Sequence, residues 1–133
     1  MPEPQVTYAS NPAVTNEALI ELFANAWPAP REPREFAPVL EQSLGYVCAY
    51  RQGRLIGFVN VAWDGGHHAF LLDPTVRSEY QRRGIGTELV RRAAELARAK
   101  GTEWLHVDYE PRLAEFYQKC GFRKTDAGLL KLK

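Results

Sequence analysis

The sequence has little cysteine and almost no net charge. Its 133 residues include two cysteines, and 17 basic residues nearly balance 16 acidic ones, which gives a formal net charge of +1. Cys48 and Cys120 lack the C-x-x-C spacing of zinc and redox sites and are too few for a disulfide scaffold. We therefore expect buried free thiols in a reducing compartment. We expect no overall field that would attract nucleic acid or an anionic membrane surface.

Long apolar runs and targeting segments are missing as well. No run approaches the ~20 apolar residues that span a bilayer. Residues 1–5 have neither the basic nor the apolar region of a secretion signal. The 45% hydrophobic content fits a single domain over residues 1–133 with a core of its own. We expect a soluble, cytoplasmic protein that folds without a disulfide or a metal.

Hydrophobic periodicity predicts alternating strands and helices. After a short strand at 6–8, one amphipathic helix begins at Thr15, and a second lies within 31–44, with Pro38 at its first position and Gly45 closing it. The later predicted elements are strands at 46–50, 55–63 and 67–76, a helix from 85 to 101, a strand at 104–109, a helix from 113 to 121 and a hairpin at 122–133. This order, β-α-α-β-β-β-α-β-α-β-β, predicts an α/β fold. We expect a mixed sheet with helices on both faces, parallel where strand, helix and strand alternate.

A glycine-rich turn is the most informative segment. Residues 80–87, Tyr-Gln-Arg-Arg-Gly-Ile-Gly-Thr, follow a predicted strand and open a predicted helix. Glycines let the backbone approach a ligand closely. A helix N-terminus adds N–H donors and a partial positive charge, so the two together can hold a pyrophosphate. The segment lacks the Lys-Ser/Thr of a P-loop and the third glycine of a dinucleotide fingerprint; an ordinary helix start with solvated arginines is the alternative.

The same turn carries a family resemblance. Residues 81–86 are similar to the Q/R-x-x-G-x-G/A motif of the GNAT superfamily of N-acetyltransferases. Residues 72–76 resemble the fourth strand of that family, and residues 116–122, Phe-Tyr-Gln-Lys-Cys-Gly-Phe, resemble its F/L-Y-x-x-x-G-F element. The resemblance is clear over residues 46–122. It implies an acetyl-CoA-dependent N-acetyltransferase that acetylates a primary amine by direct attack within a ternary complex, without a metal.

The resemblance also implies which residues bind the coenzyme. Backbone amides of the turn would hold its pyrophosphate, and the fourth strand would pair with its pantetheine arm beside a bulge that splays this strand from the fifth. The amide of Val76 would face the thioester carbonyl and stabilise the developing oxyanion, a role often worth ~3 kcal/mol. The implied coenzyme-binding residues are Pro74, Thr75, Val76, Arg82, Arg83, Gly84, Ile85, Gly86 and Thr87.

Tyr117 is the implied general acid. It matches the family's tyrosine that protonates the departing thiolate, and a thiol of pKa ~8.5 leaves more readily when a hydroxyl donates a proton. A core aromatic on the helix stripe is the alternative for this residue. Glu110, followed by Pro111, stands where many members carry an asparagine that binds the pantetheine arm. Either that contact is missing in this chain, or the carboxylate serves the acceptor amine.

Carboxylates near the end of the fifth strand are candidate bases. An alkyl amine with pKa ~10.4 must lose a proton before it attacks. Asp108 and Glu110 are two residues apart and share one face of the strand, so one could attract the amine while the other accepts its proton. Asp73 is a third acid that we expect on the acceptor side. For each of the three, a solvated loop acid is the alternative.

Aromatic and histidine side chains complete the candidate list. Trp27 lies in the loop that lines the acceptor pocket in the resembled family, and Trp63 lies at the hairpin before the fourth strand. Their rings would suit a cationic amine, although both could equally be core or rim residues. His67 and His68 are expected at a hairpin edge. No other ligands stand at metal-binding spacing, so we expect no metal site.

Two rival functions were weighed against this hypothesis. A non-catalytic acyl-CoA-binding regulatory module would keep the turn without the chemistry. Nucleic-acid binding through the arginines of 77–92 is disfavoured because Glu88 and Glu95 interrupt the basic patch. We expect a small-molecule or peptide amine as the acceptor, no nucleic-acid or membrane partner, and either a monomer or a homodimer.

Overall fold

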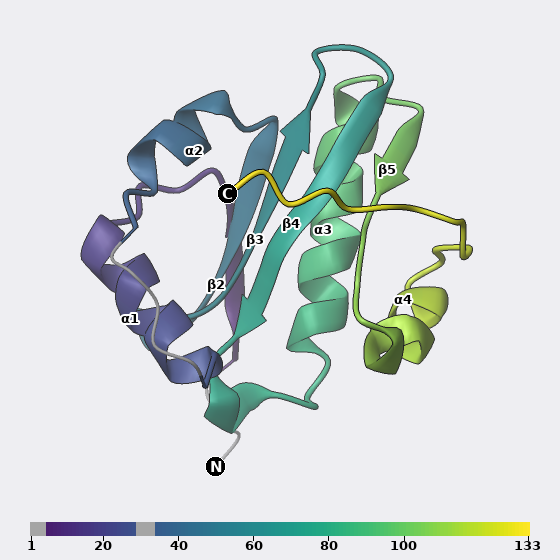
Figure 1. Cartoon of the computed structure of the whole chain (residues 1–133). Helices are drawn as coiled ribbons and strands as arrows, with labels where there is room; N and C mark the ends of the chain where they lie inside the picture. Colours follow the sequence, from purple (N-terminus) through teal and green to yellow (C-terminus); the bar gives the residue numbers. More distant parts are fainter. Residues whose placement is uncertain (1–4, 29–33) are drawn as a thin grey trace.

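A five-stranded mixed sheet forms the centre of the molecule (Figure 1). The computed structural model describes residues 5–28 and 34–133. The first four strands form three antiparallel pairs in succession, and the fifth strand pairs in parallel with the fourth. In spatial order the strands are β1 (Thr7–Ser10), β2 (Gly45–Arg51), β3 (Arg54–Trp63), β4 (His68–Val76) and β5 (Trp104–His106).

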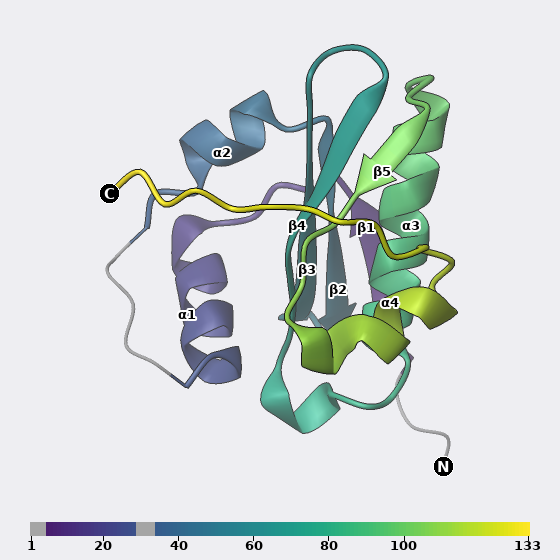
Figure 2. The same ribbon diagram turned by 45° about the vertical axis from the view of Figure 1, so that its right-hand side comes forward.

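Helices cover both faces of this sheet (Figure 2). Helices α1 (Asn16–Ala26) and α2 (Ala37–Gln42) lie on one face, and α3 (Ile85–Ala99) lies on the other, with α4 (Ala114–Lys119) beside it. Single 3₁₀ turns precede α3 and α4, at Ser78–Tyr80 and Pro111–Leu113. The α/β class, the mixed sheet and the two helical layers are therefore as predicted. None of the described helices is long and apolar enough to cross a membrane.

Local sequence signals account for most helix ends. The Thr15 hydroxyl accepts a hydrogen bond from the Ala18 amide at 3.1 Å and caps α1. Pro38 is the second residue of α2, one position later than predicted but still in the first turn. Residues 31–33 of the predicted second helix lie outside the described residues. That helix ends at Gln42 with Ser43 as its C-cap, so the prediction that Gly45 closes it was wrong. Gly45 begins β2 instead, where an added Cβ would lie 3.0 Å from the Asn11 side chain and leave no room for a larger residue.

The sheet separates two apolar clusters. Val59 and Val61 of β3 pack toward Leu89 of α3. Phe58, with the opposite strand parity, packs against Leu22 of α1 and the rest of the second cluster. Both cysteines are free thiols, as predicted: Cys48 is buried, and Cys120 is partly buried. Burial raises the pKa of the Cys48 thiol to about 11.

The C-terminal part departs from the prediction. β5 ends at His106, three residues earlier than expected, and residues 122–133 form no strand, so the predicted hairpin was wrong. In Figures 1 and 2 this tail runs from α4 across the sheet toward α2 instead of lying beside β5. Leu129, Leu130 and Leu132 are 85–86% exposed. With no apolar surface against these leucines and no ladder partner, nothing holds the tail in a hairpin.

Candidate functional site

The turn before α3 is shaped as an anion cradle. Arg82 and Gly84 both adopt left-handed backbone angles, with φ of 63° and 83°. Gly84 is the N-cap of α3, a helix of 15 residues. The first amides of that helix, at 85–87, have no carbonyl partner within it. A left-handed arginine costs about 1 kcal/mol or more, so the surrounding structure holds this turn in place. When right-handed and left-handed backbone conformations alternate in this way, successive N–H groups point into one concave site that can bind an anion.

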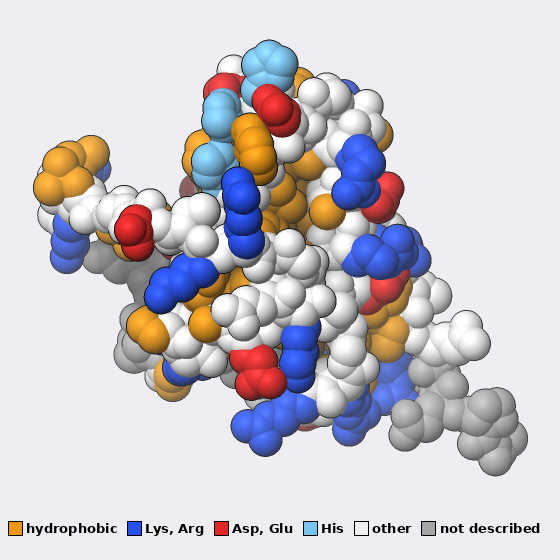
Figure 3. All heavy atoms as spheres, turned by 90° about the vertical axis from the view of Figure 1, so that its right-hand side faces the viewer, with side chains coloured by type: hydrophobic (Ala, Val, Ile, Leu, Met, Phe, Trp, Pro, Cys, Tyr) orange, Lys and Arg blue, Asp and Glu red, His pale blue; other side chains and the backbone are white. Residues whose placement is uncertain are grey.

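Neighbouring elements pack closely around this cradle. A Cβ on Gly86 would lie 3.5 Å from the Phe116 ring of α4 and 3.9 Å from the Val76 side chain of β4. The Arg83 guanidinium lies over the Tyr80 ring, 5.5 Å from its centroid. Figure 3 shows basic side chains gathered at the lower end of the molecule, where α3 begins. The cradle therefore adjoins the ends of β4 and α4 and is locally positive.

A bulge interrupts β4 immediately before the cradle. Phe58 of β3 pairs with Thr75, but Asn60 pairs with Leu72, so β4 carries one extra residue between these pairs. Asp73 has a left-handed φ of 54° there, and Pro74 follows without an N–H. The bulge expected in this strand is confirmed.

The backbone of Val76 faces the side of β4 away from β3. Val76 lies opposite Gly57, and the next amide, that of Arg77, donates to the Ile56 carbonyl at 2.8 Å. In an antiparallel pair this alternation turns the N–H and C=O of Val76 outward. The Gln81 side-chain amide donates to the Val76 carbonyl at 2.9 Å. β5 pairs only with residues 68–70, so the Val76 N–H faces an unpaired stretch between the diverging chains.

Tyr117 of α4 belongs to the apolar cluster against which Val76 packs. It is 3% exposed, stacks on Tyr109 with ring centroids 4.8 Å apart, and meets Phe116 and Phe122 edge to face. Burial, with smaller contributions from nearby Cys120 and Asp108, raises the pKa of its phenol to about 12. The phenol therefore stays protonated at neutral pH. This position fits a proton donor, and its packing also fits the core aromatic that was the alternative.

The three candidate acids are distributed over two places. Asp108 and Glu110 are exposed on the segment after β5, and Glu110 accepts a hydrogen bond from Arg112 at 2.9 Å. Asp108 is near enough to influence Tyr117. Asp73 lies at the β4 bulge and pairs with Arg34 at 3.4 Å. Of the three acids, Asp108 is thus the one whose charge acts on the Tyr117 phenol.

The two candidate tryptophans, Trp27 and Trp63, lie on opposite faces of the sheet. The Trp27 indole donates to the Thr75 hydroxyl at 3.2 Å, and that hydroxyl donates to the Asp73 carbonyl at 3.0 Å, so Trp27 belongs to the bulge. Trp63 packs against the cluster beneath α3 and is not brought to this place. The strand parity that it shares with Val59 and Val61 explains the difference.

The histidines gather at the far end of the sheet, visible as pale blue side chains in Figure 3. His68 Nδ1 lies 2.8 Å from His106 Nε2, across the β4–β5 pairing. His67 precedes β4 at the hairpin, as expected. Within the described residues, no three His, Cys, Asp or Glu side chains are grouped as metal ligands.

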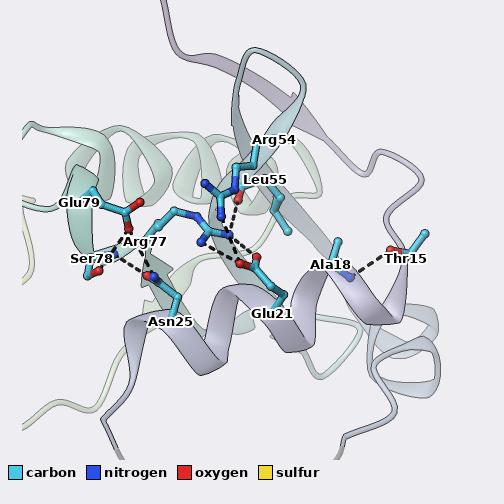
Figure 4. Close-up of polar contacts among 9 residues, drawn as sticks. All are labelled: Thr15, Ala18, Glu21, Asn25, Arg54, Leu55, Arg77, Ser78 and Glu79. Atoms are coloured by element: carbon cyan, nitrogen blue, oxygen red, sulfur yellow. Dashed lines mark hydrogen bonds and ion pairs between the residues drawn. The ribbon is translucent and has the colours of Figure 1, made fainter.

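A polar cluster that the sequence did not reveal holds α1 against the end of β4 (Figure 4). Arg77 is 1% exposed and donates to both carboxylate oxygens of Glu21, at 2.9 Å for Nη1–Oε1. The Asn25 side-chain oxygen accepts from the Ser78 amide at 2.8 Å. Arg77, considered for nucleic acid in the sequence, is therefore a buried structural residue.

A second missed feature is a groove of about 330 Å³ between α2 and the sheet. Its walls are apolar, from Pro38, Val39, Ala62 and Leu72, and its polar members are Gln42, Ser43 and Asn60. Leu72 immediately precedes the bulge. An isolated asparagine in the apolar strand 55–63 was the signal that could have revealed this groove.

Comparison with known proteins finds a matching family model and curated relatives. A family model described as the acetyltransferase (GNAT) family matches residues 14–122. A serotonin N-acetyltransferase from rice, Oryza sativa subsp. japonica, is 30% identical over 109 residues, which cover 79% of this chain and 54% of the rice protein. The chain thus spans about half the length of the curated relatives that it matches.

Solved structures show the same fold. A GNAT-family protein from Streptococcus pneumoniae superposes with a TM-score of 0.78 at 22% identity, and the match covers 97% of this chain and 100% of that one. The aminoglycoside N-acetyltransferase AAC(6')-Iy, solved in complex with CoA, gives a TM-score of 0.78 at 19% identity over 99% of this chain and 97% of its own. At these identities the likeness establishes the fold.

Proposed function

The chain belongs to the GNAT acetyltransferase family, and on that premise we propose that it transfers an acetyl group from acetyl-CoA to a primary amine. The observation that carries the proposal is the placement of three features around the end of β4. The cradle at 82–87 adjoins the end of β4, the Val76 N–H faces the unpaired stretch, and Tyr117 of α4 belongs to the apolar cluster against which Val76 packs.

The cradle fits the diphosphate of coenzyme A. The amides of 85–87 at the start of α3 point outward, and Arg82 and Arg83 add exposed positive charge. The pantetheine arm would lie along residues 74–76, on the side of β4 away from β3, where the Val76 N–H faces the unpaired stretch. In this arrangement the Val76 N–H donates to the thioester carbonyl oxygen and stabilises the negative charge that develops there.

The remaining residues manage the protons. The amine nitrogen attacks the thioester carbon, the new C–N bond forms, and the C–S bond breaks. Tyr117 donates its proton to the departing sulfur, and the proton of the amine leaves toward Asp108, directly or through water. Glu110 is the less favoured base because Arg112 already holds its carboxylate. Substrate and coenzyme are bound together, so the transfer is direct.

The test is an amine panel with acetyl-CoA, monitored by thiol release and product mass. We expect thiol release that depends on both the amine and the protein, with a product heavier by one acetyl group. Binding of acetyl-CoA without amine-dependent thiol release would favour the non-catalytic acyl-CoA-binding module. A small-molecule or peptide acceptor and a cytoplasmic location remain predictions from the sequence.

A further inference from the structure

The outer edge of β5 has no partner strand. β5 is the last strand of the sheet, and it pairs with β4 alone among the described residues. Such an edge leaves N–H and C=O groups that can pair with another chain. Trp104 and His106 share one face of β5, and both are exposed, Trp104 to 47%. The edge therefore offers both backbone hydrogen bonds and an apolar surface.

The tail carries the groups that such an edge binds. Residues 123–133 form no strand, and within the described part of the chain no backbone hydrogen bond involves them. Leu130 and Leu132 are 85% and 86% exposed. An extended tail directs Leu130 and Leu132 to one face and Lys131 and Lys133 to the other. This alternation is typical of a strand that is buried on one face, yet the tail buries neither leucine within its own molecule.

The tail does not reach the β5 edge of its own molecule. At its start the Phe122 ring meets the Tyr117 ring edge to face, with centroids 5.8 Å apart. The Arg123 guanidinium lies over the Trp104 ring, 5.7 Å from its centroid. From this point the chain crosses the sheet toward α2, away from the outer edge of β5 (Figures 1 and 2). A strand that covers this edge therefore comes from another molecule.

Charge makes a second copy of this chain a suitable partner. The segment 103–110, which contains β5, has no Lys or Arg, and its exposed acids are Glu103, Asp108 and Glu110. The tail has one acid, Asp126, and its basic residues are Arg123, Lys124, Lys131 and Lys133. None of the ion pairs within the described residues involves Glu103, Asp108 or a lysine of the tail. Opposite charges of this kind guide two surfaces together and favour one arrangement.

The tail of one copy and the β5 edge of another complement each other. We infer that residues 129–133 of each copy add as a strand to the outer edge of β5 in a second copy, so that two chains form a homodimer. Leu130 and Leu132 then pack on Trp104. The lysines of the tail lie on the opposite face of the added strand, near Glu103. Each copy gives one strand and receives one, so the contact is reciprocal and closes at two chains.

The first test is the mass of the protein in solution, measured by light scattering. One chain has a mass of 15.1 kDa, and we expect twice that value. The double variant Leu130→Glu, Leu132→Glu should raise the dimer dissociation constant at least about a hundredfold, because two apolar side chains are lost from the contact. Ile20→Glu is the matched control, since Ile20 is 37% exposed on α1, and this variant should remain a dimer.

Hydrogen exchange followed by NMR locates the contact. In the dimer we expect slow exchange at the amides of 129–133 and at the β5 amides that face away from β4, and in the double variant fast exchange at both. A wild-type monomer at high micromolar concentration overturns the inference, and so does a dimer that survives the double substitution. A dimer whose tail amides exchange fast overturns it as well. Thiol release with an amine is measured separately, so none of these outcomes bears on the proposed function.

Discussion

Gly84 offers a sharp test of the cradle because the structure contains a matched control. Gly84 and Gly65 have the same φ of 83°, and an added Cβ would meet no atom within 4 Å at either position. A non-glycine residue in this left-handed region costs about 1–2 kcal/mol, partly offset by the lower entropy of the unfolded alanine chain. Gly84→Ala and Gly65→Ala should therefore each lower the free energy of unfolding by about 1 kcal/mol.

Their effects on coenzyme binding should differ. Gly84 caps α3, while Gly65 lies in the hairpin at the opposite end of β4. Distorting the cap weakens at least one hydrogen bond from the backbone to a phosphate, worth about 1.5–3 kcal/mol. We expect the Kd for CoA, measured by calorimetry, to rise about ten- to a hundredfold in Gly84→Ala. Gly65→Ala should bind as wild type does. Equal CoA affinity in the two variants would refute the role given to the cradle.

Three further predictions concern Tyr117 and the α1 cluster. Tyr117→Phe should lower kcat while the Kd for CoA changes little; unchanged turnover would remove the phenol from the mechanism. The pKa of Tyr117 is about 12 in the folded state and 10 in the unfolded state, so the unfolded chain loses this proton first as the pH rises. The free energy of unfolding should therefore fall by ~3 kcal/mol between pH 10 and 12. Urea titrations should show a smaller fall in Tyr117→Phe. Glu21→Gln removes the charge that pairs with buried Arg77 and should lower the free energy of unfolding in urea by ~1–3 kcal/mol. Glu95→Gln, at an exposed ion pair, should lower it by less than ~0.5 kcal/mol. Equal losses would contradict a stabilising role for the Arg77–Glu21 contact.

The sequence predicted helix ends correctly where nearby residues determine the local conformation. Thr15 before an apolar stripe, Pro38 in a first turn and Gly84 before α3 each specify a helix end through nearby backbone chemistry. The bulge at Pro74 was expected from the family resemblance, and proline is compatible with it because it cannot donate to a ladder.

Long-range packing decided the rest. The tail containing Leu129 has the alternation of a strand, yet a strand forms only where a partner edge is available. The Arg77–Glu21 contact and the groove around Asn60 join residues distant in the chain, and no local pattern places them together. Trp63 is the opposite case, because the alternation of side chains along β3 could be predicted from the sequence. That alternation places Trp63 on the face covered by α3.

The most direct measurement of the central claim is an amide ¹H–¹⁵N spectrum recorded while CoA is added. The account predicts the largest shifts at the amides of residues 82–87 and at Val76, with saturation at the Kd that calorimetry gives. Binding that leaves these amides unshifted, or no binding at millimolar CoA, would contradict it.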